Sequence, residues 1–517
     1  MRRQAAALAL LVAAGFLLRG GLLLAAENRL DADESTVGVM ALDILEGKAL
    51  PFFFYGVAYN GGGALEAYLA AGLFALLGPS AGAVKLGLLL LWTATAALFA
   101  DLCRRSLTPH QALLATLFFC VGTPFFLEWS LKARGGFAET ALVTVLLLWL
   151  ATPPPALRRR PGLQSLAFGL ATGVGLWASE MVLALVPCAV AWLLVRCGPG
   201  RRARAAVGLS LAIPAAAIPL LLYNLGHDWE HLRSSVLYGL VAGSRGSAPL
   251  DLAQLRLALG FALGPAWLLI ALGGGVAAAR AMRERPLHLG HVVAIHTVLY
   301  LLAFWISGLR YLPVPPTRVL YALYPGLAIL LAWAAAPAAG APPAWRRVAQ
   351  GAVALGLLAS LAPVVGWARS GEPRETGSWR GSWGLVDGAA LYQTLVKEDV
   401  RVVYANYWTS WSLRFANRLA AHADPEAPLL EVTWNLPAQG SWAPGRAALV
   451  LNPGSPLQQR LERHVARRTI PHRRIEAAGR VILSRIVPAQ LDQAGGFPSA
   501  LGVGDWRPPG PAPDGFN

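Results

Sequence analysis

The chain has little charge, few cysteines and none of the common nucleotide or zinc motifs. Charged residues make up 14% of its 517 residues and hydrophobic residues 56%, which is outside the usual range for a soluble globular protein. All four cysteines lie within or beside apolar stretches, so neither a disulfide framework nor a CxxC metal site is expected. The sequence contains no glycine-rich loop of the Walker type and no HExxH zinc motif. These absences argue against a Walker-type nucleotide enzyme and favour an integral membrane protein.

Arginine clusters separate the apolar stretches in a regular alternation. About eleven apolar segments run from Ala5 to Trp367, and every second gap between them is basic. Because basic loops stay on the cytoplasmic side of a membrane, the alternation predicts a polytopic α-helical protein whose acidic and aromatic gaps lie outside. The net charge of +16 is therefore assigned to topology and to anionic lipid, and no nucleic acid partner is expected. The basic clusters are Arg2-Arg3, Arg104-Arg105, Arg158 to Arg160, Arg201-Arg202-Arg204, Arg280 to Arg285 and Arg346-Arg347.

The expected membrane spans are apolar helices able to cross a ~30 Å hydrocarbon core. The first is expected to remain uncleaved, because Glu27-Asn28-Arg29 makes a poor signal-peptidase site. Gly63–Leu77 is too short to span, and a span there would invert every later loop, so it is expected as an interfacial or re-entrant helix. The spans are Ala5–Ala26, Ala83–Ala100, Gln111–Leu127, Gly135–Ala151, Leu163–Ala178, Met181–Val195, Ala205–Leu225, Leu257–Ala279, Leu289–Ser307, Arg318–Ala335 and Val348–Trp367.

The composition changes after Trp367, and the change predicts three regions. Residues 1–367 form the membrane domain, in which residues 27–80 are the first outside loop. Residues 368–488 are expected to form a small α/β domain outside the membrane. Residues 489–517 are rich in glycine and proline, which predicts disorder. Within the α/β domain we expect strands at Val400–Tyr404, Ala447–Leu451 and Arg480–Val487 and a helix at Trp411–Ala421.

Polar residues gather at the helix ends that are expected to face outside. Ionisable groups at membrane depth are costly and usually line a cavity, so the group is a candidate functional site. Glu139 and Glu180 are the most informative members, because each lies inside or at the edge of a span. For any single member the competing interpretation is a solvated loop residue. The group consists of Asp31, Asp33, Glu34, Glu128, Lys132, Arg134, Glu139, Glu180, Arg310 and Arg318.

The first outside loop carries an ordered set of short motifs. Asp33-Glu34 follows the first span directly, and Ala41, Gly47 and Pro51 come after it. An acidic pair, a helix of small residues, a glycine and an aromatic-proline stretch in this order resemble the GT-C glycosyltransferases, which are polytopic enzymes that use polyprenyl-phosphate sugars. The resemblance is to the protein O-mannosyltransferases, the lipid A aminoarabinose transferases and bacterial relatives acting on envelope polysaccharides.

Three later stretches resemble the same enzymes. They are Arg134 to Glu139, Arg310-Tyr311-Leu312-Pro313 and Tyr404 to Trp408. The segment Tyr59 to Gly63 departs from the aminoarabinose transferases, which have a lysine there, so a phosphate contact is not expected from that segment.

The resemblance implies both a reaction and a location. The enzyme would move a hexose or pentose from a polyprenyl-phosphate donor to a hydroxyl of a lipid, glycan or protein acceptor. The site and the C-terminal domain would face the periplasmic or extracellular side of a bacterial cytoplasmic membrane. Such a donor already carries a good leaving group, so the protein must supply a general base and stabilise the departing phosphate.

The resemblance places the catalytic acid at Asp33, with Glu34 or Asp31 orienting it or the acceptor. Basic side chains suit the phosphate, and arginine in particular can contact an oxyanion with two hydrogen bonds. A divalent metal is compatible with the acids, but no residue pattern demands one. The phosphate ligands we expect are Arg134, Lys132 and Arg310, and the further substrate contacts are Glu139, Tyr59, Tyr311 and Glu180.

Several alternatives remain at this point, among them a non-catalytic scaffold and a ligase that uses lipid-linked polymers. A transporter or flippase for lipids or small molecules would also carry charges inside spans, although no two-half repeat is visible and the polar residues cluster on one side. For Asp33 alone, the alternative is that its carboxylate merely caps the helix that follows.

Overall fold

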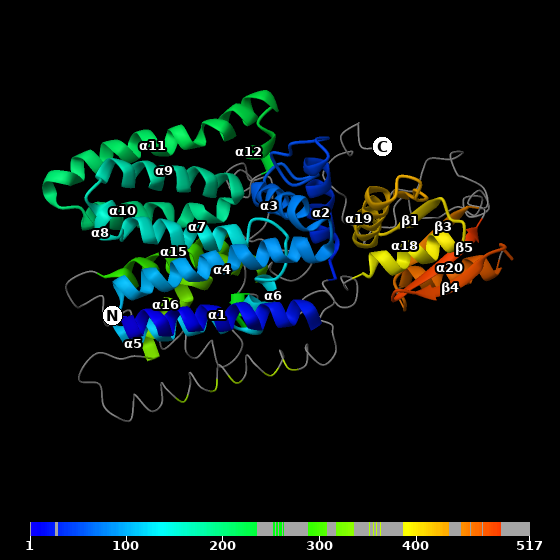
Figure 1. The fold of residues 1–517 in the computed structure, drawn as a ribbon, viewed down its shortest axis with the longest axis horizontal. Helices are drawn as coiled ribbons and strands as arrows, with labels where there is room; N and C mark the ends of the chain where they lie inside the picture. The colour runs from blue at the N-terminus through cyan, green and yellow to red at the C-terminus, as the bar shows by residue number, and fades with distance from the viewer. Residues whose placement is uncertain are drawn as a thin grey trace. The chain divides into compact units, whose positions relative to one another are not determined.

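The fold was analysed in a computed structural model (Figure 1). The structure describes residues 2–25, 29–234, 288–307, 317–335, 386–433 and 446–486 without 455 and 468, with single residues between 252 and 262 and between 351 and 365. The chain divides into two compact units. The first consists of Met1–Glu27, Phe52–Glu66 and Lys85–Ser378, and the second of Asn28–Pro51, Ala67–Val84 and Trp379–Asn517. The first outside loop is therefore shared between the two units.

The first unit is helical in the part that the structure describes (Figure 1). Among the described residues, four helical stretches are long and apolar enough to cross a membrane: Arg2–Ala25, Ala81–Ser106, Pro199–Gly226 and Leu289–Ile306. The chain is thus a multi-pass membrane protein. Its helices are α1 (Arg2–Ala25), α3 (Gly61–Leu77), α4 (Ala81–Ser106), α5 (Pro109–Val121), α6 (Pro124–Trp129), α7 (Ala138–Ala151), α8 (Pro155–Arg158), α9 (Pro161–Ala178), η1 (Glu180–Ala184), α10 (Val186–Arg196), α11 (Pro199–Gly226), α12 (Glu230–Ser234), α15 (Leu289–Ser307), η2 (Thr317–Leu323) and α16 (Tyr324–Ala335), of which α3 and α4 also extend into the second unit.

One predicted span is wrong as a continuous helix. The stretch Gln111–Leu127 divides into α5 and α6, because Gly122 adopts a φ of 70° and Pro124 cannot donate a backbone hydrogen bond. The Thr123 hydroxyl accepts the backbone N–H of Phe126 and so caps the new helix.

Two other predicted spans begin with a 3₁₀ segment. Met181–Val195 divides into η1 and α10, and Arg318–Ala335 into η2 and α16. The spans predicted at Leu257–Ala279 and Val348–Trp367 lie almost wholly outside the described residues. The count of eleven spans therefore stays a prediction.

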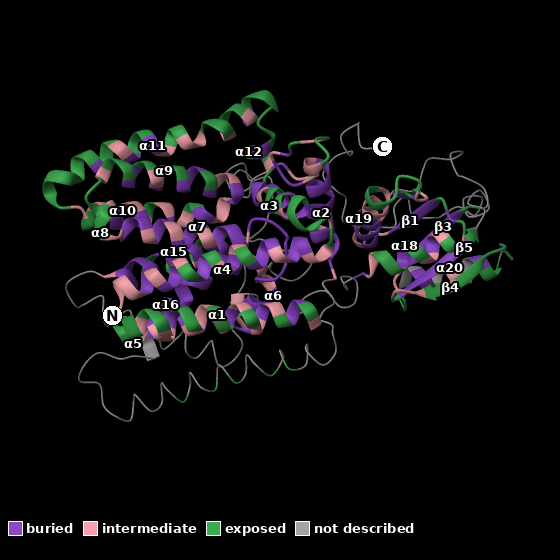
Figure 2. Ribbon diagram, in the orientation of Figure 1, coloured by how far each residue is buried: buried purple, intermediate pink, exposed green. Residues whose placement is uncertain are grey.

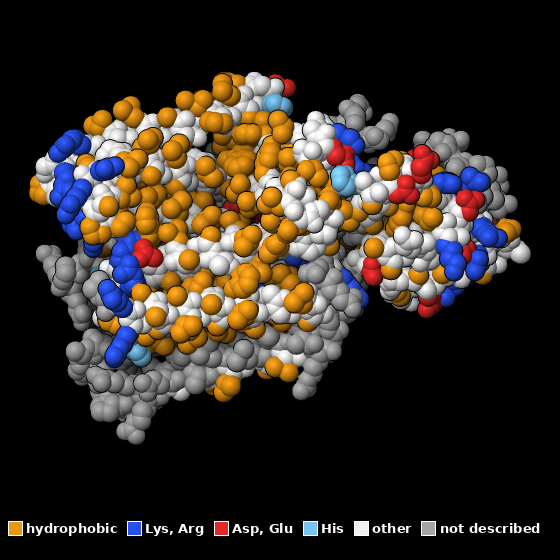
Figure 3. All heavy atoms as spheres, in the orientation of Figure 1, with side chains coloured by type: hydrophobic (Ala, Val, Ile, Leu, Met, Phe, Trp, Pro, Cys, Tyr) orange, Lys and Arg blue, Asp and Glu red, His pale blue; other side chains and the backbone are white. Residues whose placement is uncertain are grey.

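Basic side chains gather at one end of the first unit. In Figure 3 they lie at the end where α1 begins and α8 is found, whereas the side of the helices visible in that view is mostly apolar. This is the pattern that the alternating arginine clusters predict. The clusters that are described at this end are Arg2-Arg3, Arg104-Arg105, Arg158 to Arg160 and Arg201-Arg202-Arg204.

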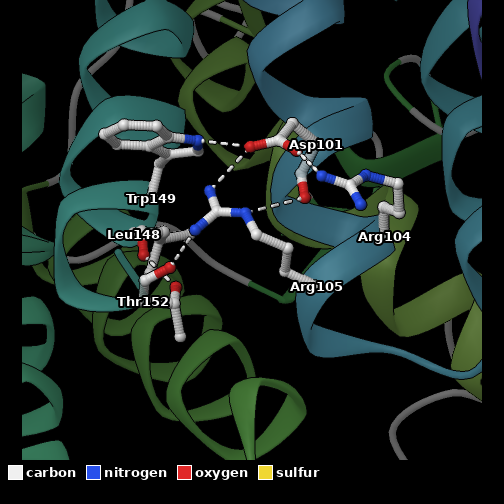
Figure 4. Close-up of polar contacts among 6 residues, drawn as sticks. All are labelled: Asp101, Arg104, Arg105, Leu148, Trp149 and Thr152. Carbon is white, nitrogen blue, oxygen red and sulfur yellow. Dashed lines mark hydrogen bonds and ion pairs between the residues drawn. The ribbon is translucent and has the colours of Figure 1, made fainter. Parts of the chain in front are cut away.

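The same end holds a polar connection between α4 and α7 (Figure 4). Arg105 Nη1 donates to the backbone oxygen of Thr152 at 2.5 Å, and its Nη2 lies 2.9 Å from Asp101 Oδ2. That carboxylate oxygen also accepts the indole N–H of Trp149 at 2.8 Å. Thr152 is the C-cap of α7, so its carbonyl has no donor within the helix and the guanidinium of Arg105 supplies one.

The second unit contains a five-stranded mixed sheet in the order β2-β1-β3-β5-β4. β1 (Val402–Ala405) pairs in parallel with β2 (Glu431–Thr433) and β3 (Ala447–Leu451), and β5 (Arg480–Ile486) pairs antiparallel with β3 and β4 (Arg473–Ala477). β1 and β3 are buried throughout (Figure 2), as their continuous apolar sequences require. The helices of this part are α18 (Gly388–Lys397), α19 (Tyr407–Ala423) and α20 (Pro456–Arg467).

The predicted strands and helix of this region are found, with some elements added. β3 has the predicted bounds, and β1, β5 and α19 overlap their predictions. β2, β4, α18 and α20 were not predicted. β4 is polar, with three of its five residues exposed, so it lacks the apolar run by which the other strands were recognised. The predicted boundary near residue 368 and the tail 489–517 lie outside the described residues and stay predictions.

The second unit also joins the first outside loop to the C-terminal sheet. Helix α2 (Ala32–Leu45) packs on α19, where a Cβ on Gly38 would lie 2.6 Å from Cε2 of Phe415. Arg418 bonds to Asp43 Oδ1 at 2.8 Å and to Glu46 Oε2 at 2.7 Å. The helix expected after the acidic pair is buried over nearly its whole length (Figure 2), in part because α19 packs against it.

Candidate functional site

The three acids of the first loop lie at the start of α2. Asp31 is the N-cap: its Oδ1 accepts the backbone N–H of Glu34 at 3.1 Å, and Glu34 Oε2 accepts the backbone N–H of Asp31 at 3.0 Å. This reciprocal capping box occupies two of the three carboxylates. The interpretation of Asp33 as the cap is therefore wrong. Asp33 is half-buried in the first turn, where the helix dipole favours a negative charge.

In the first unit, two glycine pairs bring separate motifs into backbone contact. A Cβ on Gly62 would lie 2.1 Å from the backbone nitrogen of Gly136, and one on Gly135 would lie 2.2 Å from that of Gly63. Gly135 and Gly136 have positive φ angles of 67° and 79°. The Asn60 side chain adds a hydrogen bond to the carbonyl of Arg134 at 3.2 Å. The segment Tyr59 to Gly63 therefore packs directly against the stretch Arg134 to Glu139, and the two together are called the glycine contact.

The tip of the α9–η1 hairpin lies beside the glycine contact. The carbonyl of Ala178 and the Cβ of Ser179 would be 3.5 and 3.6 Å from a Cβ on Gly136. The predicted site residue Glu180 follows directly and is half-buried at the start of η1. Trp177 Nε1 donates to the carbonyl of Phe52 at 2.8 Å, which ties the same hairpin to the first loop.

Two buried carboxyl groups lie against the glycine contact. Glu66 Oε2 accepts the backbone N–H of Gly135 at 2.8 Å. Glu139 is 1% exposed, interacts with Glu66, and has its Oε2 3.1 Å from the place of a Cβ on Gly62. Like charges buried together require a proton or a cation nearby. Within the ranges that the structure describes, no group of three or more His, Cys, Asp or Glu side chains could hold a metal ion.

Three buried cations belong to the same region. Lys85 Nζ donates to the carbonyl of Leu131 at 3.1 Å, and Lys132 Nζ forms an ion pair with Glu128 Oε1 at 2.9 Å. Arg134 Cζ lies 5.1 Å from the centre of the Trp129 ring, and Lys132 Nζ lies 5.7 Å from it. All three cations are less than 8% exposed. Buried ammonium and guanidinium groups at one place suit an anionic ligand.

Two charged residues that lie against the stretch from Leu131 to Glu139, Glu66 and Lys85, were not among the predicted site residues. The available signal was local: Glu66 interrupts an otherwise apolar helix, and Lys85 lies near the start of an apolar span. Their partners at Gly135 and Leu131 could not be read from the sequence.

The remaining predicted site residues have separate outcomes. Tyr59 is 39% exposed beside Asn60. Arg310 and Tyr311 lie outside the described residues. Asp31, Asp33 and Glu34 belong to the second unit, whereas Lys132, Arg134, Glu139 and Glu180 belong to the first.

The comparisons with known proteins concern the fold. No protein-family model and no curated protein matches the chain. ArnT from Cupriavidus metallidurans bound to undecaprenyl phosphate has a similar structure, with a TM-score of 0.57 and 14% identity over 92% of this chain and 98% of that chain. For ArnT in the apo state the values are 0.58 and 13%, over 93% and 98%. The Archaeoglobus fulgidus oligosaccharyltransferase in complex with Zn and sulfate gives 0.45 and 13%, over 79% and 61%, too weak a likeness to bear on the site. The likeness to ArnT covers nearly the whole of both chains, so the predicted resemblance is confirmed at the level of the fold.

Proposed function

We propose that the chain is a membrane glycosyltransferase that moves a sugar from a polyprenyl-phosphate donor to an acceptor hydroxyl. The observation that carries the proposal is the buried group of Lys85, Lys132 and Arg134 in a helical unit with the fold of ArnT. The reaction would take place on the outer face of a bacterial cytoplasmic membrane, opposite the basic end of the first unit. A lipid phosphate is the ligand class that combines an anionic head with a chain that stays in the bilayer.

The cations would bind the donor phosphate and stabilise the negative charge that grows as the sugar leaves. Lys85, Lys132 and Arg134 are all candidates for this contact, because each is buried in the same region. Glu139 and Glu66 would contact sugar hydroxyls, with Tyr59 and Glu180 at the edge. Arg310 and Tyr311 are proposed as further phosphate and substrate contacts on the strength of the sequence motif alone.

Asp33 would act as the general base that takes the proton of the acceptor hydroxyl. One fact supports this choice among the three acids: Asp33 is half-buried, whereas Asp31 and Glu34 are buried. Asp31 and Glu34 would then act indirectly, by fixing the turn that holds Asp33.

The test compares Asp33→Asn with the matched variant Asp31→Asn. Removing a general base lowers a rate by a factor of about 10² or more, whereas asparagine caps a helix about as well as aspartate. Mass spectrometry of envelope glycans should therefore show loss of the modification in cells carrying Asp33→Asn and its retention with Asp31→Asn. Binding of undecaprenyl phosphate should survive in both variants and weaken in Arg134→Gln.

If Asp33→Asn transfers sugar at a near-normal rate, Asp33 is not the general base and the role belongs to another acid.

A transporter makes a different prediction. If the purified wild-type protein in liposomes moved the lipid donor between leaflets and left its sugar attached, the transferase proposal would be wrong.

A further inference from the structure

The break between α5 and α6 leaves carbonyl groups without helical donors inside the membrane domain. α5 ends at Val121, and the backbone N–H of Gly122 bonds to Phe118, so the carbonyls of Phe119 and Cys120 need partners from elsewhere. Water is scarce at this depth, and an unpaired backbone carbonyl is costly there. The Tyr324 hydroxyl donates to Phe119, and Arg19 Nη1 donates to Cys120 at 2.5 Å.

The same guanidinium reaches the far end of α6. Arg19 Nε donates to Ser130 Oγ at 2.8 Å, and Ser130 is the C-cap of that helix. The Ser130 hydroxyl donates in turn to the carbonyl of Leu127 at 2.6 Å. One side chain of α1 therefore joins the last turn of α5 to the C-cap residue of α6.

Arg19 is held in one orientation. It is fully buried, and its Cζ lies 3.7 Å from the centre of the Trp92 ring of α4. In the part of the chain that the structure describes, its hydrogen-bond partners are all uncharged: Gly15, Cys120, Ser130 and the side chain of Tyr324. A buried charge whose described hydrogen-bond partners are uncharged is costly in a membrane helix. Its guanidinium compensates for that cost by bonding to groups on both sides of the break between α5 and α6.

We propose that Arg19 is a positioning residue for the donor-phosphate group. Ser130 lies one residue before Leu131, the acceptor for Lys85, and two before Lys132. By fixing Ser130, Arg19 fixes the stretch Leu131 to Arg134 that carries the cations. The inference rests on the proposed function only for what those cations bind, and not for how they are held.

The test uses Arg19→Lys, which keeps the charge but replaces the planar fork, whose Nε and Nη1 bond to Ser130 and Cys120, with a single nitrogen. Ser130→Ala removes the hydrogen bond from Arg19 and the one to the carbonyl of Leu127, and it changes no charge. Both variants should raise hydrogen–deuterium exchange in peptides covering residues 122–135 and weaken binding of undecaprenyl phosphate about tenfold. The double variant should lose little more than Arg19→Lys alone, because the two residues share one interaction.

The matched control is Arg105→Lys at the opposite end of the unit (Figure 4). Arg105 also bonds to a helix-end carbonyl, at 2.5 Å, and lies over a tryptophan ring, with its Cζ 4.9 Å from the centre of Trp149. Its loss should lower thermal stability to a similar degree without changing exchange in residues 122–135 or lipid binding.

The outcomes separate the two proposals. If hydrogen–deuterium exchange of residues 122–135 is unchanged in both Arg19→Lys and Ser130→Ala, the positioning role is wrong, whatever the effect of these variants on lipid binding. The role would equally be wrong if Arg105→Lys raised exchange there as much. Wild-type protein that fails to bind undecaprenyl phosphate would refute the proposed function, while raised exchange in the Arg19 and Ser130 variants would still support the positioning role.

Discussion

A single methyl group at Gly62 should damage the candidate site more than its size suggests. The Cβ of an alanine there would lie 2.1 Å from the backbone nitrogen and 2.7 Å from the Cα of Gly136. Carbon atoms normally approach to about 3.5–4.0 Å, so the two backbones would have to separate by more than about 1 Å. Neither atom belongs to a side chain that could rotate away. The separation would also move Glu139, whose Oε2 lies 3.1 Å from the same Cβ position.

The expected magnitude follows from two opposing terms. Overpacking a tight contact costs about 1–3 kcal/mol, and a backbone contact belongs at the upper end of that range. Replacing glycine by alanine in a helix interior gains up to about 1 kcal/mol, and less at Gly62, which lies in the first turn of α3. The net effect of Gly62→Ala should be a loss of about 1–2 kcal/mol.

Gly72→Ala provides the matched control. Gly72 lies in the same helix, is exposed, and has no atom within 4 Å of its Cβ position. The same substitution there should leave thermal stability unchanged or raise it. Thermal unfolding in detergent and glycan modification in cells should both distinguish the two variants, with loss of both only in Gly62→Ala. Equal stability and equal activity of the two variants would refute the close contact between the first loop and the Arg134–Glu139 stretch.

Two further predictions concern the second unit and the orientation of the chain. Burial opposes ionisation of Glu46, but the hydrogen bond from Lys48 and the charge of Arg418 outweigh it and hold its pKa below the ordinary 4.5. The packing of α2 on α19 should therefore keep the Glu46 contribution at neutral pH and lose it as the pH falls below 4.5 and through the lowered pKa. Thermal unfolding measured from pH 7 to well below pH 4 should show this loss, and Glu46→Gln should remove the pH-dependent part. A reporter active only in the cytoplasm, fused after residue 369, should be silent, and strong activity there would contradict the predicted topology.

The sequence by itself determined the elements whose signal is local. α1 and α15 are long apolar runs, and the predicted Leu289–Ser307 matches the observed helix at both ends. β3 is a short continuous apolar run, which is the pattern of a strand buried on both faces. The acids after the first span were also visible in the sequence, as were Lys132 and Arg134 between two later spans, because ionisable residues beside apolar spans are rare.

Tertiary structure alone decided how these residues are used. The bond of Glu66 to Gly135 joins positions 69 residues apart, that of Lys85 to Leu131 joins positions 46 apart, and the pair of Arg418 with Asp43 spans 375. No periodicity or local propensity encodes such pairs, because each depends on where the chain returns after several helices. The cap of α2 shows the same limit at short range. Three neighbouring acids were each able to cap the helix, and the backbone conformation at Asp31 decided which one does.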